Sequence, residues 1–358
     1  MIGQRLKLAR SAAGLSLRQL SDTIDNRVTA QAIGKYERNE SMPSSSVLMA
    51  LADALGVKIE YLMSDPNLVL EGLEFRKKTL TRKREEARLE ARVLDRLERY
   101  LTVEALLGLP SVDWDKPGEA PYPVENELME ADGAALSVRT HWGLGLDPIP
   151  NMMELLEERG IKVLSIPLGD IDGMTAKVRR LDDVFAPVIV VNADHWGERQ
   201  RFTSAHELGH LVMNVNPAID EEKAAHRFAG AFLMPAETLW SEVGKHRKSI
   251  SLGELLDLKQ WFGASVQAIV YRCKDLGIIG NSTYQALFQE FSQRGWRTPP
   301  YQEPLALPGE KPSRFERLCF RAASESAISE SKAAELLGVS IHALMEKMDP
   351  PEAVDQAR

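Results

Sequence analysis

The sequence predicts a mostly helical α+β fold divided among two or three domains. Apolar residues recur at helical spacing along most of the chain, whereas two short runs, IKVLSIPL at 161–168 and PVIVVN at 187–192, have strand-like composition. Proline-rich intervals at 110–123 and 298–312 interrupt the helical pattern. A chain of 358 residues is long enough for two or three domains that each bury a core. We therefore expect helical domains, one of which contains a small sheet.

The composition is that of a globular protein, not of a disordered or membrane protein. Charged residues make up 27% and hydrophobic residues 44% of the chain, and the net charge of −8 excludes a uniformly basic nucleic-acid binder. The two cysteines, Cys273 and Cys319, exclude a disulfide framework and a cysteine zinc site. The N-terminus is amphipathic and lacks the apolar core of a signal peptide. We expect a cytoplasmic location and no membrane partner.

Residues 1–65 form the first predicted domain. From Ile2 to about Met63, apolar residues recur in short helical bursts that are broken by AAGLS, DNRVT and NESMPSSS. This pattern predicts five short helices.

Residues 66–123 are predicted to form a basic helical spacer and a proline-rich linker. The stretch 76–100 carries ten Lys/Arg and five Asp/Glu, a net charge of +5, which indicates a long polar helix with a solvated surface. Residues 110–123 contain four prolines, which is typical of an extended surface segment. We expect a second domain at 124–296, followed by a helical C-terminal region at 297–358.

The segment FTSAHELGHLVM, residues 202–213, carries the clearest chemistry in the sequence. Residues four apart share one face of a helix, so His206 and His210 can present ring nitrogens to one metal ion about 2.0–2.1 Å away. Glu207 projects beside that face and can accept a proton from a water molecule that zinc has made more acidic. The pattern indicates a hydrolytic zinc site, and the alternative is a degenerate or structural site.

A hydrolytic zinc ion needs a third protein ligand and an open fourth position. The next segment, DEEKAAHRFAGAFLMP at 220–235, has the pattern of a second helix and contains several residues that can bind a metal. These are Asp220, Glu221, Glu222 and His226.

The phrases ERQRFTSAHELGH and EEKAAHRFAGAFLMP resemble the ImmA/IrrE metallopeptidases. The resemblance extends through most of 124–296 and includes IPNMMELLEERGIKVLSIPL, PVIVVN and LKQWFGASVQAIVYRCKDLGII. It implies a helical, zincin-like peptidase core with a small antiparallel sheet, whose edge strand aligns an extended substrate by main-chain pairing. The glutamate ligand of the family precedes an alanine by three residues. That relation selects Glu222 before Ala225 and implies a gluzincin-like site.

One position departs from the family pattern, because asparagine is usual where this chain has His226. His226 either orients a ligand or the substrate, or replaces Glu222 as the third ligand, and Glu221 is a further alternative. Tyr271, on a helix after the zinc segment, either donates a hydrogen bond to the oxyanion or only packs. His195, in the loop before the histidine helix, is close enough in sequence to approach the cleft.

The segment LSLRQLSDTIDNRVTAQAIGKYERN is similar to the helix-turn-helix of the Xre (lambda-repressor-like) family. The resemblance implies a first helix at Leu17–Ile24 and a recognition helix at Thr29–Arg38, with Thr29 as its N-cap. The N-terminal residues of a recognition helix meet base edges. The candidate DNA contacts are therefore Arg18 and Arg38 for the phosphate backbone, and Ala30, Gln31 and Lys35 for the bases.

The first domain is barely basic, since residues 1–63 carry eight Lys/Arg and six Asp/Glu. It also departs from the Xre pattern at Leu17, where glutamine is usual, and in the turn DNRV, which is longer than the usual GV. We expect operator binding to need a homodimer or help from the basic spacer helix. The alternative is a protein-docking module of the same fold.

Two later segments look superficially like helix-turn-helices, and we assign 251–277 to the peptidase core and 328–348 to a helical C-terminal cap.

Together these features predict a transcriptional regulator that binds operator DNA and carries a Zn²⁺-dependent endopeptidase. His206, His210 and Glu222 would hold the zinc ion. Members of the peptidase family cut repressors of the Xre class, so the resemblance implies a protein substrate. This substrate is either such a repressor or the chain's own N-terminal half. The alternatives are a non-proteolytic, metal-containing sensor and an antitoxin-like module that binds a toxin.

Overall fold

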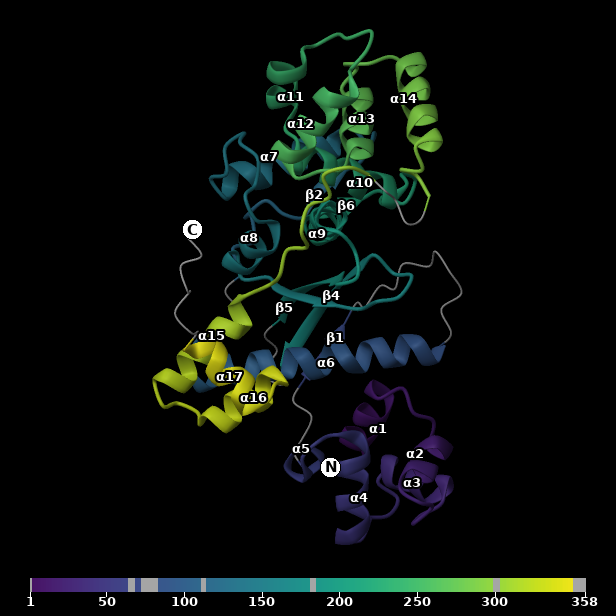
Figure 1. Ribbon diagram of the computed structural model, residues 1–358, viewed down its shortest axis with the longest axis vertical. Helices are drawn as coiled ribbons and strands as arrows, with labels where there is room; N and C mark the ends of the chain where they lie inside the picture. Colours follow the sequence, from purple (N-terminus) through teal and green to yellow (C-terminus); the bar gives the residue numbers. More distant parts are fainter. Residues whose placement is uncertain are drawn as a thin grey trace, which may run out of the picture. The chain divides into compact units, whose positions relative to one another are not determined.

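The computed structural model describes residues 2–63, 68–71, 83–110, 114–180, 185–298 and 303–349. The chain divides into two compact units. Unit 1 comprises Met1–Val112, Lys177–Phe185 and Phe315–Arg358, and unit 2 comprises Asp113–Ala176 and Ala186–Arg314. Helices dominate both units, and a few short strands complete them (Figure 1). The predicted class, a mostly helical α+β fold, is confirmed.

The N-terminal domain in unit 1 contains the five predicted helices. They are α1 (Ile2–Ala12), α2 (Leu17–Thr23), α3 (Ala30–Glu37), α4 (Ser45–Leu55) and α5 (Ile59–Met63). Thr29 caps α3 as expected, because its hydroxyl accepts a hydrogen bond from the Ala32 amide at 3.2 Å. The side chains of Leu6, Leu20 and Ile33 are fully buried at the centre of these helices. The burial of this apolar stripe holds the short helices together.

Helix α6 (Lys83–Leu106) lies within the predicted helical spacer, but its surface is not solvated throughout as its charge predicted. Leu89, Val93 and Leu97 recur every four residues and are buried, so the highly charged helix still has one apolar face. Helix α1 packs against α6, and the buried Arg5 side chain forms an ion pair with Glu98. The N-terminal domain and α6 therefore share an interface within unit 1.

The C-terminal helices also pack on α6. They are α15 (Arg314–Ser324), α16 (Glu330–Leu337) and α17 (Ile341–Met348). Tyr100 and Val103 of α6 share a buried apolar cluster with Leu318 and Leu336. Glu335 of α16 pairs with Lys58, next to α5. The N-terminal domain and the C-terminal helices thus both pack on α6.

The expected small sheet is present, but it is mixed and not antiparallel throughout. Its order is β1-β4-β5-β3, from β1 (Leu68–Glu71), β3 (Lys162–Ile166), β4 (Gly173–Arg180) and β5 (Phe185–Asn192). β1 pairs antiparallel with β4, whereas β3 and β5 pair parallel. The chain leaves β3, forms β4 farther out and returns between them as β5, so β5 runs in the direction of β3. The β-like sequence runs predicted β3 and β5 but not β1 or β4.

Unit 2 contains helices in addition to its part of the sheet. These are α7 (Glu130–His141), α8 (Met152–Glu158), α9 (Gly197–Val212), α10 (Glu221–Leu233), α11 (Ala236–Val243), α12 (Leu252–Phe262), α13 (Val266–Asp275) and α14 (Asn281–Gln293). Two short strands, β2 (Tyr122–Val124) and β6 (Met213–Val215), pair parallel. The proline-rich stretch at 110–123 therefore runs into a buried strand, because Val124 is fully buried. One continuous apolar core joins β2, α7, α9, α10 and α13.

We predict that Leu97→Ala lowers the free energy of unfolding by about 2–5 kcal/mol, because it removes apolar atoms from a fully buried position on α6. Urea denaturation followed by circular dichroism measures this change. Glu90→Ala, at an exposed position of the same helix, is the control and should change stability by less than about 0.5 kcal/mol. If the two substitutions lowered the free energy of unfolding equally, the burial of Leu97 on α6 would be contradicted.

Candidate metal centre

Helix α9 positions both histidines of the HExxH segment on the side that packs against α10. His206 and His210 are one turn apart, and their ring centroids are 5.1 Å from each other. His206 is 1% exposed, and the His210 side chain is 11% exposed. The helix therefore presents two imidazoles at the edge of the core, where a metal ion would be partly shielded from water.

Glu222 of α10 completes a group of three side chains that could hold a metal ion. The Nε2 atoms of His206 and His210 lie 3.3 Å apart. Glu222 Oε2 lies 3.6 Å from His206 Nε2, and Glu222 Oε1 lies 3.6 Å from His210 Nε2. One ligand atom from each of the three lies within 4.8 Å of the others. Ligands on a tetrahedral ion with bonds of about 2.0–2.1 Å are separated by about 3.3–3.4 Å. The donor set therefore fits a small divalent ion.

The residues considered as alternative third ligands occupy different positions around the histidines. Glu221 Oε1 lies 3.0 Å from His210 Nδ1, on the ring nitrogen that does not face His206. The exposed His226 ring lies edge-on to His206, with 4.5 Å between ring centroids, and 5.6 Å from Phe202. Glu222 is the acidic residue whose carboxylate lies beside both Nε2 atoms.

Glu207 lies on a different side of α9, next to the start of β4. A Cβ atom added at Gly173 would lie 2.4 Å from Thr203 Cγ2 and 3.2 Å from Glu207 Oε1. Glycine at this position therefore lets the strand approach the helix closely. Glu207 is 1% exposed and does not belong to the three-residue donor group. Gly173 was not identified from the sequence, although a glycine at the start of a strand is a signal of such close approach.

His195 lies in an ion-pair cluster at the first turn of α9. Asp172 Oδ1 lies 3.6 Å from His195 Nδ1 and 2.6 Å from Arg199 Nη2. Burial lowers the pKa of His195, and the positive charge of Arg199 lowers it further. Because Asp172 immediately precedes Gly173, this cluster borders the strand that approaches Glu207.

Tyr271 packs against aromatic residues of α14. Its ring lies edge-on to Tyr284, with 5.6 Å between the centroids, and 6.3 Å from Phe288. The side chain is also substantially exposed, at 53%. These contacts favour the packing interpretation of Tyr271 over an oxyanion contact.

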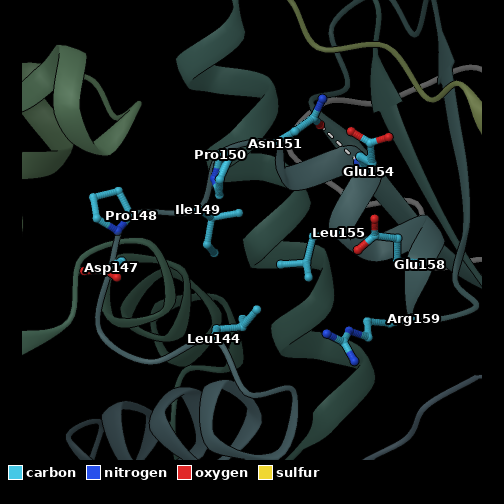
Figure 2. Close-up of a pocket in the computed structure, with 10 residues that line it drawn as sticks. All are labelled: Leu144, Asp147, Pro148, Ile149, Pro150, Asn151, Glu154, Leu155, Glu158 and Arg159. Carbon is cyan, nitrogen blue, oxygen red and sulfur yellow. Dashed lines mark hydrogen bonds between the residues drawn. The ribbon is translucent and has the colours of Figure 1, made fainter.

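A hollow of about 260 Å³ lies beside α8. Figure 2 shows its lining, which combines apolar side chains such as Leu144 and Leu155 with the acidic Glu154 and Glu158. The histidines and Glu222 are not among the lining residues, so this hollow is separate from the candidate metal centre.

The candidate DNA contacts lie on the surface of the N-terminal domain. Arg18, Gln31, Lys35 and Arg38 are all exposed. A hydrogen bond with Glu40 raises the pKa of Arg38, and Arg38 Nε lies 2.6 Å from Glu40 Oε1. This pairing partly neutralises Arg38, so Arg18, Gln31 and Lys35 are the better-placed contacts for nucleic acid.

No helix in the part of the chain that the structure describes is both long and apolar enough to cross a bilayer. No curated protein matches the chain. Residues 156–274 match the IrrE N-terminal-like domain of the peptidase M78 family, and residues 6–62 match a helix-turn-helix family. The first range contains α9, α10 and the three metal donors, and the second contains α2 and α3. The chain therefore joins a helix-turn-helix domain to an IrrE N-terminal-like domain of a metallopeptidase family, as the sequence predicted.

Proposed function

We propose that this protein is a DNA-binding transcriptional regulator that carries a zinc-dependent endopeptidase. Its substrate is a protein, either an Xre-type repressor or its own N-terminal half. The observation that carries the proposal is the arrangement on α9. Two histidines approach Glu222 of α10, while the adjacent Glu207 remains outside this donor group. A purely structural metal site has no use for such an additional buried carboxylate.

His206, His210 and Glu222 hold the zinc ion in this proposal. Two imidazoles and one carboxylate are a donor set that zinc accepts, and three protein ligands leave a position open for substrate. Zinc supplies Lewis acidity at such a site, because it acidifies water and polarises a carbonyl oxygen. The Glu222 side chain is 43% exposed, which is consistent with access from solvent.

Glu207 acts as the general base. It accepts a proton from the attacking water and later gives a proton to the departing amine of the peptide. The Glu207 carboxylate projects from α9 towards Gly173, so the attacking water and the peptide carbonyl would meet near the beginning of β4. By the family resemblance, an edge strand of the sheet aligns the extended substrate by main-chain pairing.

His226 assists from α10, one turn after Glu222. Its ring contacts His206, so it restricts the orientation of that ligand, and its exposed side chain can also contact the substrate. The helix-turn-helix domain brings the enzyme to operator DNA or to its target. Homodimer formation would supply the second half-site contact that a barely basic domain needs.

Our first functional prediction concerns the metal. Purified protein should contain about one zinc ion per chain, and His206→Ala, His210→Ala and Glu222→Ala should each lose most of it, because three-ligand binding is cooperative. Inductively coupled plasma mass spectrometry measures the content. His342→Ala, an exposed histidine of α17, is the control and should retain zinc. If Glu222→Ala kept its zinc while His226→Ala or Glu221→Ala lost it, the third ligand would be His226 or Glu221 and not Glu222.

The second prediction concerns DNA. Gln31→Ala should reduce discrimination between operator and random duplex by about 1–3 kcal/mol, whereas Arg18→Ala should weaken binding to both duplexes. Fluorescence anisotropy, with an operator selected from a random pool, measures both affinities. Asp53→Asn, at an exposed position of α4, is the control. Equal affinity of the unaltered protein for all duplexes would favour the protein-docking alternative.

The third prediction separates peptidase from sensor. Glu207→Gln nearly preserves size, so zinc content, folding and DNA affinity should stay unchanged. The proton acceptor is lost, however, and cleavage should slow by about 10²–10⁴-fold. Incubation with cell extract, followed by mass spectrometry of newly formed peptide N-termini, detects the difference. In cells, the variant should bind its operator but fail to derepress the regulated genes. Derepression at full strength would exclude the proteolytic mechanism, even with every zinc ligand correctly assigned.

A further inference from the structure

Residues 303–314 follow the last helix of unit 2 and, apart from Arg314 at the start of α15, have no regular secondary structure, yet unit 2 binds them along their length. The Gly197 amide, at the start of α9, donates to the Leu307 carbonyl at 3.0 Å. Gln260 donates to the Leu305 carbonyl at 2.8 Å. The amides of Ser313 and Arg314 donate to Glu157 at 2.9 Å and 3.0 Å. The 303–314 segment is therefore an ordered part of the unit that contains the metal centre.

One buried ion-pair group joins this segment to the first turn of α9. Lys259 Nζ lies 2.5 Å from Glu198 Oε1 and 2.7 Å from Glu303 Oε2. All three side chains are at most 7% exposed. Glu198 also accepts a hydrogen bond from the Leu307 amide at 3.1 Å. Removing the Lys259 charge would leave two buried carboxylates without a counter-charge.

A second group centres on Glu310. One carboxylate oxygen pairs with Arg201 of α9, and the other accepts hydrogen bonds from the amides of Met152 and Met153 at 2.8 Å and 3.0 Å. The Arg201 side chain is 5% exposed and also donates to the carbonyls of Ile149 at 2.6 Å and Gly263 at 3.1 Å. A single carboxylate thus links the 303–314 segment to α9 and to the start of α8.

The Glu310 group holds, through Arg201, the side of α9 that faces away from the metal donors. At about 100° per residue, Arg201 lies about 140° around the helix from His206 and about 180° from His210. A rotation of α9 would move His206 and His210 together, but it would not move Glu222, which belongs to α10. Metal ligands must be held to within about 0.5 Å of the productive geometry. The contacts behind α9 therefore control the separation of the donors.

We propose that the 303–314 segment is a positioning element of the metal centre, and that Glu310 is its principal positioning residue. The inference rests on the proposed ligand set and extends it, because it gives a role to a segment that lies beyond the matched peptidase range of 156–274. Glu310 does not touch the metal donors. It acts through Arg201, which fixes the rotation of α9 relative to α10.

Full-length Glu310→Ala tests this inference. Competition with a chelating dye should show zinc affinity lowered by about 10–100-fold, the usual effect of losing a group that orients metal ligands. The visible absorption of the Co²⁺-substituted protein should also change, because it reports the coordination geometry. Glu310→Gln should lose less affinity, since it keeps an acceptor for the α8 amides and lacks only the charge that pairs with Arg201.

Two variants serve as controls. Leu305→Ala changes an exposed side chain of the same segment and should leave affinity unchanged. Leu287→Ala removes a buried side chain of α14 and should lower the unfolding temperature without changing affinity or spectrum. If Glu310→Ala behaves like Leu287→Ala, the segment only stabilises the fold and the inference is overturned. If the unaltered protein does not bind zinc, the proposed ligand set is wrong, and this result is distinct from a failure of the Glu310 variants alone.

Discussion

The packing of α9 against α10 is the constraint on which the metal centre depends, because the donors come from both helices. Small residues permit this close packing. A Cβ atom at Gly209 would lie 3.1 Å from Phe228 Cδ1, and Ala225 and Ala229 are fully buried. Close approach of two helix backbones brings Glu222 to 3.6 Å from each histidine. A bulkier residue at these positions would separate the helices and with them the donors.

Each of the two helices has its own buried ionic support. Arg227 of α10 donates to Asp132 of α7 at 3.0 Å, and Arg272 of α13 donates to the same carboxylate at 2.9 Å. Helix α9 is held instead by Arg201 and Glu198 through the 303–314 segment. Buried ion pairs add little net stability, but they demand a specific geometry. This property suits a site in which two buried polar side chains, His206 and Glu207, must keep fixed positions.

Features with a local sequence pattern could be predicted, and features that depend on distant contacts could not. The HExxH helix, the following helix and the five N-terminal helices were recognisable from spacing and capping residues within a dozen positions. The approach of Gly173 to Glu207 joins residues 34 positions apart, and the Arg201 pair with Glu310 joins residues 109 apart. The charge of α6 concealed its buried leucines, because composition over 76–100 averages a polar face with an apolar one. The parallel pairing of β3 and β5 depends on chain path, which strand composition does not encode.

The packing of unit 1 also bears on the choice of substrate. Helix α1 holds the N-terminal domain on α6 through apolar contacts and the Arg5 pair with Glu98, while the exposed Gln31 and Lys35 lie on α3. Cutting the chain between the N-terminal domain and α6 would therefore leave the domain bound to α6 by noncovalent contacts, with its candidate DNA-contacting side chains unchanged. Such a cut would not by itself release the operator. This arrangement favours a separate Xre-type repressor over the chain's own N-terminal half as the substrate.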